Sequence, residues 1–571
     1  MRCPDSSNDR LKDIEKEMNL QPSLANMRQL VPWVLAFVSV VVAVGAYLQA
    51  LHYPFVNDDT VYLVENTKLA GLHPAELWRL FIEPYNPYEF LPLRDLSYWF
   101  DITLFGLTPS AFRLHNILLY LICLPLVYAT TLGLWRYFRP ADATSAPWAA
   151  AAVTALFVLH PAHTEAVVWI SGRKDVLSTM FSLLAFWFAL KAKREYGLSH
   201  RYAAAALAAL LAAMLSKATT VAIAPIIALL WTLFWHDIPG PDRRRSALLW
   251  PLAGLVLAAC MALMFSANST VKAEGYFGVE VITRALAVLG WLTRLAVSPE
   301  SRHFIYPVFD GPNLVVMVIL GVAIMLATLL SIVAILRKRS LEGFALIAFV
   351  LICMPYTQLI PYATPSLVSD RFLALGVWPA ALLIVALSWR LKAAPRTAIL
   401  LAIALPWSCQ TMERPRDWRS YEALMDSDLR AYPGHYLPAF QKIMSYQLPK
   451  GRFREAGELA NTIIAQEERA IMRKLVEVAI DLRDARISGD PRNAMTHLQD
   501  LEQLLKLPPV QSKWDPAMLH FWKESQDSFV LEWQWLVKSF PDDTSVRYNA
   551  RLSLGSVLNY GNTAAQSQSP P

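Results

Sequence analysis

Charged residues are scarce in this chain of 571 residues. Asp, Glu, Lys and Arg make up 17% of it, against roughly 25% in an ordinary soluble domain, whereas hydrophobic residues make up 55%. The deficit is concentrated in the first two-thirds, where long apolar runs follow one another between short polar loops. Because a bilayer core takes about 20 apolar helical residues to cross, this pattern predicts a multi-pass helical membrane protein.

Other common patterns are also missing. The five cysteines form neither a disulfide framework nor a zinc-ligand spacing, and we interpret those in apolar runs as small buried hydrophobes. The alternating segments of about ten residues that are typical of membrane barrels are absent. The net charge of +6 does not indicate nucleic-acid binding, because the Lys and Arg residues sit at the boundaries of the apolar runs.

Eleven apolar runs predict membrane-spanning helices. They are residues 31–51, 116–135, 147–163, 176–192, 202–216, 219–236, 246–267, 313–336, 342–360, 371–389 and 396–411. A further stretch, 280–297, contains Arg284 and Arg294, which a spanning helix would have to bury. We therefore interpret it as an interfacial or re-entrant helix. The first run lacks a small-residue cleavage site and follows a polar tail, which favours a retained anchor.

Short loops rich in Lys and Arg mark the cytoplasmic side. Their alternation is regular if 280–297 does not cross, which places the tail 1–30 in the cytoplasm and everything after residue 411 outside. If 280–297 did cross, the C-terminal segment would change sides. We expect domains at 31–411, with a large outer loop 52–115, and at 412–556. The Ser-, Gln-, Asn- and Pro-rich tail 557–571 is predicted to be disordered, and the short loops favour a bacterial inner membrane.

The outer loops hold the unusual polar residues. Asp58 and Asp59 follow the first span and fit a metal site, a general base or a helix cap. His160, His163 and Glu165 form an HxxHxE string that fits a metal site or a hydrogen-bonded cluster, although Pro161 lies between the histidines and no HExxH pattern is present. A divalent metal is thus allowed but not indicated.

Four cations lie on the same predicted outer face. Arg173 and Lys174 break the positive-inside trend there, which fits either a bound phosphate or lipid headgroups. Lys217 and Arg371 stand at the ends of spans, where snorkelling cations are ordinary. All four would line one cavity only if the spans pack in a particular order.

Five strings in this order resemble a known family. They are FVNDDTVYLVEN from Phe55, PLRDLSYWFDITLFGL from Pro92, HPAHTEAVVWISGRKD from His160, LSK from Leu215 and SDRFLALG from Ser369. Over most of residues 31–430 the chain resembles the multi-pass O-mannosyltransferases that carry tetratricopeptide repeats, and more broadly the GT-C glycosyltransferases. The fold expected from this resemblance is all-α: a polytopic bundle of about 11 spans plus an interfacial helix, followed by a repeat domain.

The resemblance also implies a reaction. Such enzymes transfer a sugar, typically with inversion, from a polyprenyl-phosphate donor to a hydroxyl of an extracytoplasmic protein. By their match to the family's strings, Asp58 or Asp59 would serve as the base, and several cations would lie near the leaving phosphate. The matching cations are Arg173, Lys174, Lys217 and Arg371, and the site-shaping residues are Arg94, His160, His163, Glu165 and Asp175.

One position departs from the family pattern. An acidic residue is expected after LSK, and this chain has Ala218. The departure leaves open a non-catalytic scaffold that keeps the bundle and the repeats. A transporter is disfavoured, because transporters place polar features near the bilayer midplane, whereas these strings lie in loops at one face.

The C-terminal segment has a different composition, rich in charged and helix-favouring residues. The strings GRFREA at Gly451 and GDPRNA at Gly489 are typical of inter-helix turns in tetratricopeptide repeats, and their alanines lie about 38 residues apart against a period of 34. A third helical pair is expected at 517–556. A generic helical bundle is the alternative. Stacked helix pairs form a groove, which would capture the protein acceptor, or else serve as a lid or an assembly surface.

Overall fold

The computed structural model describes residues 34–86, 89–193, 198–237, 279–299, 303–308, 311–359, 366–464, 466–506 and 516–554. Regular structure in these ranges is helical, and the one β-bridge among them joins Lys193 and Leu198. The all-α fold class predicted from the sequence is therefore confirmed.

Four of the described helical segments are long and apolar enough to cross a membrane. They are Pro109–Phe138, Pro140–Leu159, Ala218–Trp235 and Asn313–Arg337, and four shorter apolar helices cover Val34–Leu48, His200–Ser216, Leu341–Thr357 and Val377–Ser388. These segments match eight of the eleven predicted spans. The count of eleven stays a prediction, and the span predicted at 246–267 lies outside the described residues.

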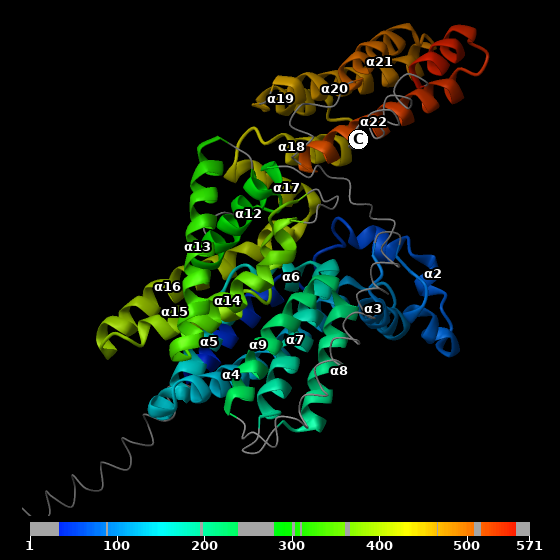
Figure 1. Cartoon of the computed structure of the whole chain (residues 1–571). Helices are drawn as coiled ribbons and strands as arrows, with labels where there is room; N and C mark the ends of the chain where they lie inside the picture. The colour runs from blue at the N-terminus through cyan, green and yellow to red at the C-terminus, as the bar shows by residue number, and fades with distance from the viewer. Residues whose placement is uncertain are drawn as a thin grey trace, which may run out of the picture.

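The bundle is built from neighbouring helices that pack along their lengths (Figure 1). Helix α4 (Pro109–Phe138) lies against α5 (Ala146–Leu159) and α7 (Arg173–Lys191), and α7 lies against α8 (His200–Ser216). The other helices of this part of the chain are α9 (Ile223–Asp237), α13 (Gly311–Lys338), α14 (Leu341–Cys353), α15 (Val377–Ser388) and α16 (Ala393–Glu413).

One end of the bundle gathers basic residues around two carboxylates. Asp237 pairs with Lys193 at 3.0 Å and Arg339 at 2.5 Å, and Glu342 pairs with Arg139 at 2.8 Å and Arg390 at 2.7 Å. All four cations belong to the loops that predict the cytoplasmic side. In the sequence these basic residues were related only by their positive charge, and the fold brings them together.

Helix α12 (Val279–Val297) covers the ambiguous stretch and runs antiparallel to α13. Gly290 faces the backbone of Met317, and Gly321 faces that of Leu286, so the two helices touch backbone to backbone at two levels. Small residues permit this close approach in membrane helices. Helix α12 therefore lies beside the first part of a helix long enough to span, and its interfacial placement stays a prediction.

This contact predicts the effect of adding one methyl group. A Cβ at position 290 would lie 2.0 Å from the Met317 carbonyl oxygen, and backbone has little freedom to move aside. We expect Gly290→Ala to lower the free energy of unfolding by about 1–3 kcal/mol, measured by thermal unfolding in detergent. Gly45→Ala is the matched control, because a Cβ there meets nothing within 4 Å. Equal midpoints for both variants would contradict the close contact.

The first outer loop folds as a small helical unit with its own apolar core. It contains η1 (Thr60–Val64), α2 (Thr67–Ala70), η2 (Pro74–Phe81) and α3 (Pro92–Phe105). Leu63, Leu80 and Tyr98 are buried in this core. The Asn66 side chain caps α2 by accepting from the Leu69 amide, and it donates to the Tyr85 carbonyl at 2.8 Å. The loop is thereby a fixed support for the polar residues that it carries.

Short helical turns join the spans at the end of the bundle where this loop lies. They are α6 (His163–Val168), η4 (Ile170–Gly172), η5 (Ala218–Ala222), η6 (Met354–Thr357) and η7 (Asp370–Leu373). The turn η3 (Pro140–Ser145) instead follows Arg139, at the basic end of the bundle. All of the strings that carry the family resemblance fall in or beside the outer loop and these turns.

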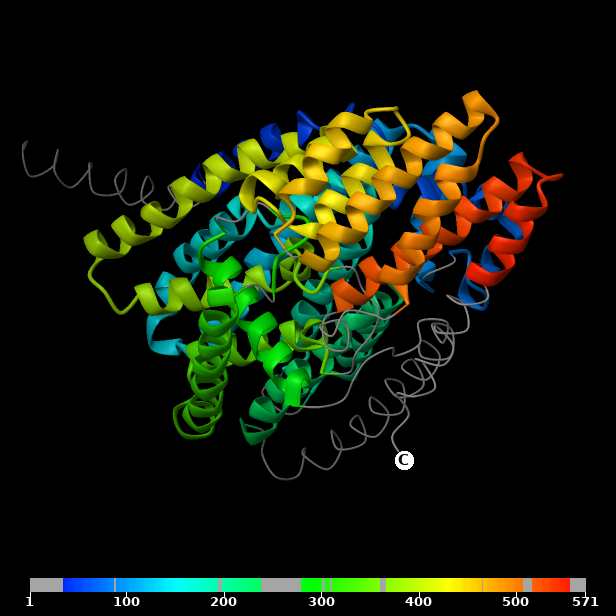
Figure 2. The same cartoon turned by 90° about the horizontal axis from the view of Figure 1, so that it is seen from above.

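The C-terminal helices stack above this end of the bundle (Figures 1 and 2). They are η8 (Arg414–Arg419), α17 (Tyr421–Ala431), α18 (Tyr436–Lys442), η9 (Ile443–Gln447), α19 (Phe453–Thr462), α20 (Gln466–Ser488), α21 (Arg492–Leu505) and α22 (Pro516–Ser539), with a further helix at 544–554. Gly451 and Gly489 have φ angles of 70° and 75° at turns between helices, a conformation that favours glycine. The assignment to tetratricopeptide repeats stays a prediction.

Candidate functional site

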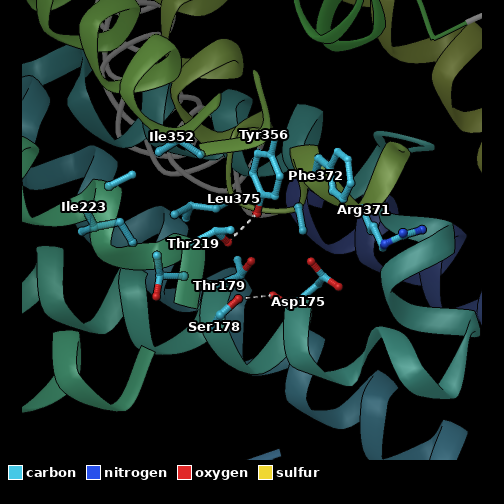
Figure 3. A pocket seen from close by; sticks show the side chains of 13 residues that line it. Asp175, Ser178, Thr179, Thr219, Ile223, Ile352, Tyr356, Arg371, Phe372 and Leu375 are labelled. Carbon is cyan, nitrogen blue, oxygen red and sulfur yellow. Dashed lines mark hydrogen bonds between the residues drawn. The ribbon is translucent and has the colours of Figure 1, made fainter. Parts of the chain in front are cut away.

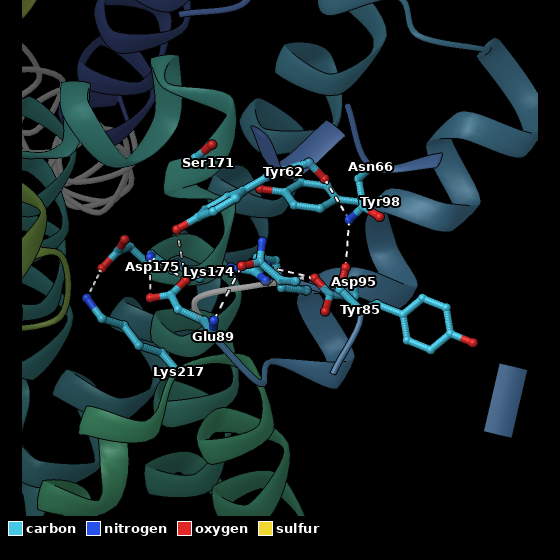
Figure 4. Close-up of polar contacts among 12 residues, drawn as sticks. Tyr62, Asn66, Tyr85, Glu89, Asp95, Tyr98, Ser171, Lys174, Asp175 and Lys217 are labelled. Carbon is cyan, nitrogen blue, oxygen red and sulfur yellow. Dashed lines mark hydrogen bonds and ion pairs between the residues drawn. The ribbon is translucent and has the colours of Figure 1, made fainter. Parts of the chain in front are cut away.

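Acidic and basic side chains from four distant segments meet at the end of the bundle that carries the outer loop. The segments are the outer loop, the start of α7 and the turn before η5 (Figure 4), together with η7, which carries Arg371. Arg173, Lys174, Lys217 and Arg371 are each paired with a carboxylate from a distant part of the chain. The fold thus brings these charged residues together, which periodicity did not reveal, whereas one cavity shared by all four predicted cations stays a prediction.

Glu89 is the centre of one cluster. Its carboxylate accepts from Lys174 Nζ at 2.7 and 2.8 Å, and from the Arg94 guanidinium at 2.6 Å. Burial alone would raise the pKa of Glu89, but Lys174 and Arg94 hold it at about 2. The group is therefore ionised. Sequence reasoning missed Glu89, because a single acid in a loop, outside the family's strings, carries no local signal.

Arg94 is itself completely buried. It donates to Asp95 at 2.9 Å as well as to Glu89, and its guanidinium lies 4.9 Å from the centre of the Tyr62 ring. Arg94 therefore ties the start of α3 to the Glu89–Lys174 pair, which fits the site-shaping role expected of it.

The two adjacent aspartates have different environments. Asp59 is completely buried and accepts three hydrogen bonds, from the Val56 amide at 3.0 Å, the Ser171 amide at 2.8 Å and the Ser171 hydroxyl at 2.6 Å. Asp58 is partly exposed, and within the described ranges its carboxylate makes no hydrogen bond. Burial raises the pKa of both carboxyls, to about 6 for Asp59, while Lys174 and Arg371 oppose the shift at Asp58.

Lys217 and Arg371 each form a buried ion pair. Lys217 pairs with Asp175, and its ammonium lies 4.9 Å from the centre of the Tyr356 ring. Arg371 pairs with Glu165, which also accepts the Arg371 amide at 3.1 Å. Because Glu165 and Asp175 are buried, removal of either cation would leave a buried carboxylate without its charged partner, which is costly.

Arg173 lies apart from these cations, although it is next to Lys174 in the chain. Its guanidinium pairs with Asp101 at 2.5 Å, and it donates to the Asn116 side chain at 2.7 Å and the Phe112 carbonyl at 2.8 Å. The side chain is completely buried. All of its contacts join α3, α4 and α7, so the structure gives Arg173 a packing role.

The two histidines lie among aromatic rings. The ring centroid of His160 lies 4.4 Å from that of Trp407, and the ring centroid of His163 lies 4.3 Å from that of Phe157 and 5.1 Å from that of Tyr120. Both side chains are buried. Of the HxxHxE string, only Glu165 reaches a cation. Among the described residues, no three His, Cys, Asp or Glu side chains are grouped so that they would share a metal ion.

The C-terminal segment contacts the same end of the bundle directly. Arg414 pairs with Asp370, which also accepts from the Tyr306 hydroxyl at 2.7 Å. Asp428 of α17 accepts the amides of Phe304 at 2.5 Å and Ile305 at 3.0 Å, and burial raises its pKa well above the ordinary value. The C-terminal helices therefore lie at the same end of the bundle as the site. This placement does not depend on whether α12 crosses the membrane.

An aromatic stack strengthens this contact. The rings of Trp169 and Trp418 are stacked with centroids 5.6 Å apart, and Phe304 meets both edge-on at 5.7 and 5.6 Å. The Arg371 guanidinium lies 5.1 Å from the centre of Trp169. A residue from the C-terminal segment thus packs against the Trp169 ring that Arg371 faces.

The chain is similar to curated proteins named protein O-mannosyl-transferases. It is 32% identical over 150 residues to TMTC1 of Mus musculus, which is 24% of this chain and 15% of that protein. It is 33% identical over 149 residues to TMTC1 of Homo sapiens, covering 24% and 16%, and 30% identical over 166 residues to TMTC4 of Homo sapiens, covering 27% and 22%.

The matched segments thus span less than a quarter of the length of these relatives. No family model matches the chain. The resemblance to protein O-mannosyltransferases that was inferred from the five strings is confirmed over about a quarter of the chain.

Proposed function

We propose that this chain is a membrane glycosyltransferase that moves mannose or a similar hexose from a polyprenyl-phosphate donor to a hydroxyl of an extracytoplasmic protein. The observation that carries the proposal is the environment of Asp58. Its carboxylate is free of side-chain hydrogen bonds within the described ranges and lies in the field of Lys174 and Arg371. A carboxylate that is free to accept a proton and is influenced by cations that suit a phosphate supports this proposal.

Different residues carry out different parts of the proposed reaction. Asp58 accepts the proton of the acceptor hydroxyl as its oxygen bonds to the anomeric carbon, on the side opposite the leaving group. The bond from that carbon to the phosphate oxygen breaks, and the polyprenyl phosphate leaves with the electron pair. Lys174, Lys217 and Arg371 stabilise the charge that develops on the phosphate. Glu89, itself paired with Arg94, holds Lys174 in position.

The proposal also includes the membrane topology and the segment that binds the acceptor. The site and the C-terminal helices lie outside the cytoplasm, with the basic end around Asp237 and Glu342 inside, in a bacterial inner membrane. The C-terminal helices bind the acceptor protein beside Asp58. Support comes from the contacts of Arg414, Trp418 and Asp428 with the site loops.

A non-catalytic scaffold is the second candidate, and Ala218 is the observation that favours it. The pairing of Lys217 with Asp175 weakens that argument. A cation that already has a buried carboxylate partner does not depend on an acid at position 218. The family's polar network is therefore not broken by this departure alone.

The experiment that separates the two candidates is a glycan measurement. Extracytoplasmic proteins from cells lacking this chain are compared by mass spectrometry with those from wild-type cells and from cells that carry a restored copy. The proposal expects hexose-bearing Ser or Thr peptides to vanish on deletion and return on restoration. Unchanged glycans in the deletion strain would contradict it and favour the scaffold.

The pKa of Asp58 predicts how the rate of transfer depends on pH. A base acts only when deprotonated, so the rate falls as pH drops through the pKa of Asp58. Because burial raises this pKa above the ordinary value, we expect the acid limb of the profile to lie above pH of about 4. The measurement is kcat/KM against pH in membranes. An acid limb at or below the ordinary aspartate value would argue against Asp58.

A further inference from the structure

Two hollows of very different size lie near opposite ends of α7. The one beside Asp175 and Arg371 (Figure 3) has a volume of about 20 Å³, which is room for about one water molecule. The one beside Lys191 is an open cleft of about 540 Å³, which lies in the usual size range of ligand sites. The first holds solvent at most, whereas the second is large enough for part of a lipid.

The walls of this cleft come mainly from one face each of α4 and α7. Their lining residues recur at spacings of three and four, as residues on one side of a helix do. Helix α4 contributes Ala129, Leu132 and Gly133 to the apolar part, and α7 contributes Trp187 and Leu190. A Cβ at position 133 would lie 3.0 Å from the Leu190 side chain, so the two helices meet there and close the cleft on one side.

Positive charge is confined to one end of the cleft. Arg136 lies seven residues beyond Ala129 on α4, and Lys191 lies four residues beyond Trp187 on α7. At a rise of 1.5 Å per residue, seven residues correspond to about 10 Å of helix. The lining therefore changes from apolar to basic over about 10 Å, toward the end of the bundle where the basic loops gather.

Two of the cations in the cleft have no carboxylate partner within the described ranges. Arg136 and Lys191 are exposed and form no ion pair there, whereas Lys193 at the rim pairs with Asp237 at 3.0 Å. The Lys191 ammonium lies 5.6 Å from the centre of the Trp187 ring, and such aromatic rings are enriched where helices meet the bilayer surface. The charges of Arg136 and Lys191 are therefore available to an anion.

Apolar walls that end in unpaired cations select the class of occupant. A free anion such as inorganic phosphate would contact the cations but leave the apolar walls uncovered. A zwitterionic lipid would cover the walls but bring no net charge to Arg136 and Lys191. An apolar helix of a second copy would leave both cations unpaired. A phospholipid with a net negative headgroup matches both parts, as basic pockets between membrane helices generally do.

We propose that the cleft between α4, α7 and α9 binds one anionic phospholipid of the surrounding bilayer. Its headgroup lies at Arg136 and Lys191, and part of an acyl chain lies along Leu132 and Leu190. The lipid links α4 and α7 at the end of the bundle opposite to Asp58. The site requires only that the bundle lies in a bilayer, and it does not depend on the proposed sugar transfer.

The test is native mass spectrometry of the intact chain in mild detergent, titrated with phosphatidylglycerol or phosphatidylethanolamine that carry the same acyl chains. The wild type should bind one phosphatidylglycerol more tightly than phosphatidylethanolamine. Arg136→Gln combined with Lys191→Gln should weaken phosphatidylglycerol about 20- to 30-fold, because each cation near an anionic lipid surface contributes about fivefold. Phosphatidylethanolamine should bind as before. Both side chains are exposed, so the thermal unfolding midpoint should not change.

Arg337→Gln combined with Lys392→Gln is the matched control. Both are exposed cations at the basic end but lie outside the cleft, so their loss should leave both affinities unchanged. Equal weakening of phosphatidylglycerol by the control would overturn the proposal in favour of general surface attraction. Equal affinity of the wild type for the two lipids would also overturn it. Glycerol phosphate bound as tightly as phosphatidylglycerol would indicate a site for small anions, and a lipid-free dimer that the Arg136 and Lys191 variant dissociates would indicate an interface between copies.

Discussion

Replacing Asp58 by asparagine should lower the rate of sugar transfer by about 100-fold or more, the usual contribution of a general base, without unfolding the protein. Asparagine keeps the shape of the side chain but does not take up a proton at neutral pH. The fold should persist because no described side-chain hydrogen bond depends on the Asp58 carboxylate. The measurement is the initial rate with polyprenyl-phosphate mannose, together with a thermal unfolding midpoint.

Glu65→Gln is the control for Asp58. Glu65 is an exposed carboxylate in the same loop, so its loss should leave the rate unchanged. A folded Asp58→Asn protein that transfers sugar at the wild-type rate would remove Asp58 as the base. The acid limb of the pH profile should also disappear in Asp58→Asn, which links this prediction to the pH dependence described above.

In contrast to Asp58→Asn, Asp59→Ala should destabilise the fold. It removes the acceptor of the Val56 amide and of the Ser171 amide and hydroxyl, all in a buried place. Each buried group left unpaired costs about 1–3 kcal/mol, so we expect a loss of roughly 3 kcal/mol or more. The measurement is thermal unfolding in detergent, with the yield of folded protein as a second indicator.

Asp426→Ala serves as the comparison for Asp59. Asp426 pairs with Lys442 at 2.5 Å, with its side chain 35% exposed, and pairs near the surface contribute about 1 kcal/mol or less. An Asp59→Ala protein as stable as Asp426→Ala would show that the link between the first outer loop and Ser171 matters little. Transfer activity in a folded Asp59→Ala protein would separate its structural role from the chemistry.

The C-terminal segment contacts the loops of the site directly. The sequence predicted only that it is helical and lies on the same side of the membrane as the site. Asp428 holds the backbone at Phe304 and Ile305, Arg414 holds Asp370, and Trp418 stacks on Trp169. The segment therefore helps to fix the residues around Arg371.

Several features were predictable from the sequence because they depend on local composition. The apolar runs that lie among the described residues all coincide with helices of the bundle, since crossing a bilayer requires length and hydrophobicity. Gly451 and Gly489 marked turns, because glycine accepts the positive φ found there. The motif strings predicted which loops carry the polar residues, and Lys174, Lys217, Arg371 and Glu165 do meet across those loops.

The rest was decided by partners far apart in the chain. Sequence alone established a helical membrane protein with acidic and basic strings in its loops, because those properties belong to single segments. Only the tertiary structure separated Asp58 from Asp59, removed Arg173 from the cations of the cluster and brought in Glu89. Each of these outcomes depends on which side chain another helix places within hydrogen-bond reach, and no local pattern encodes that distance.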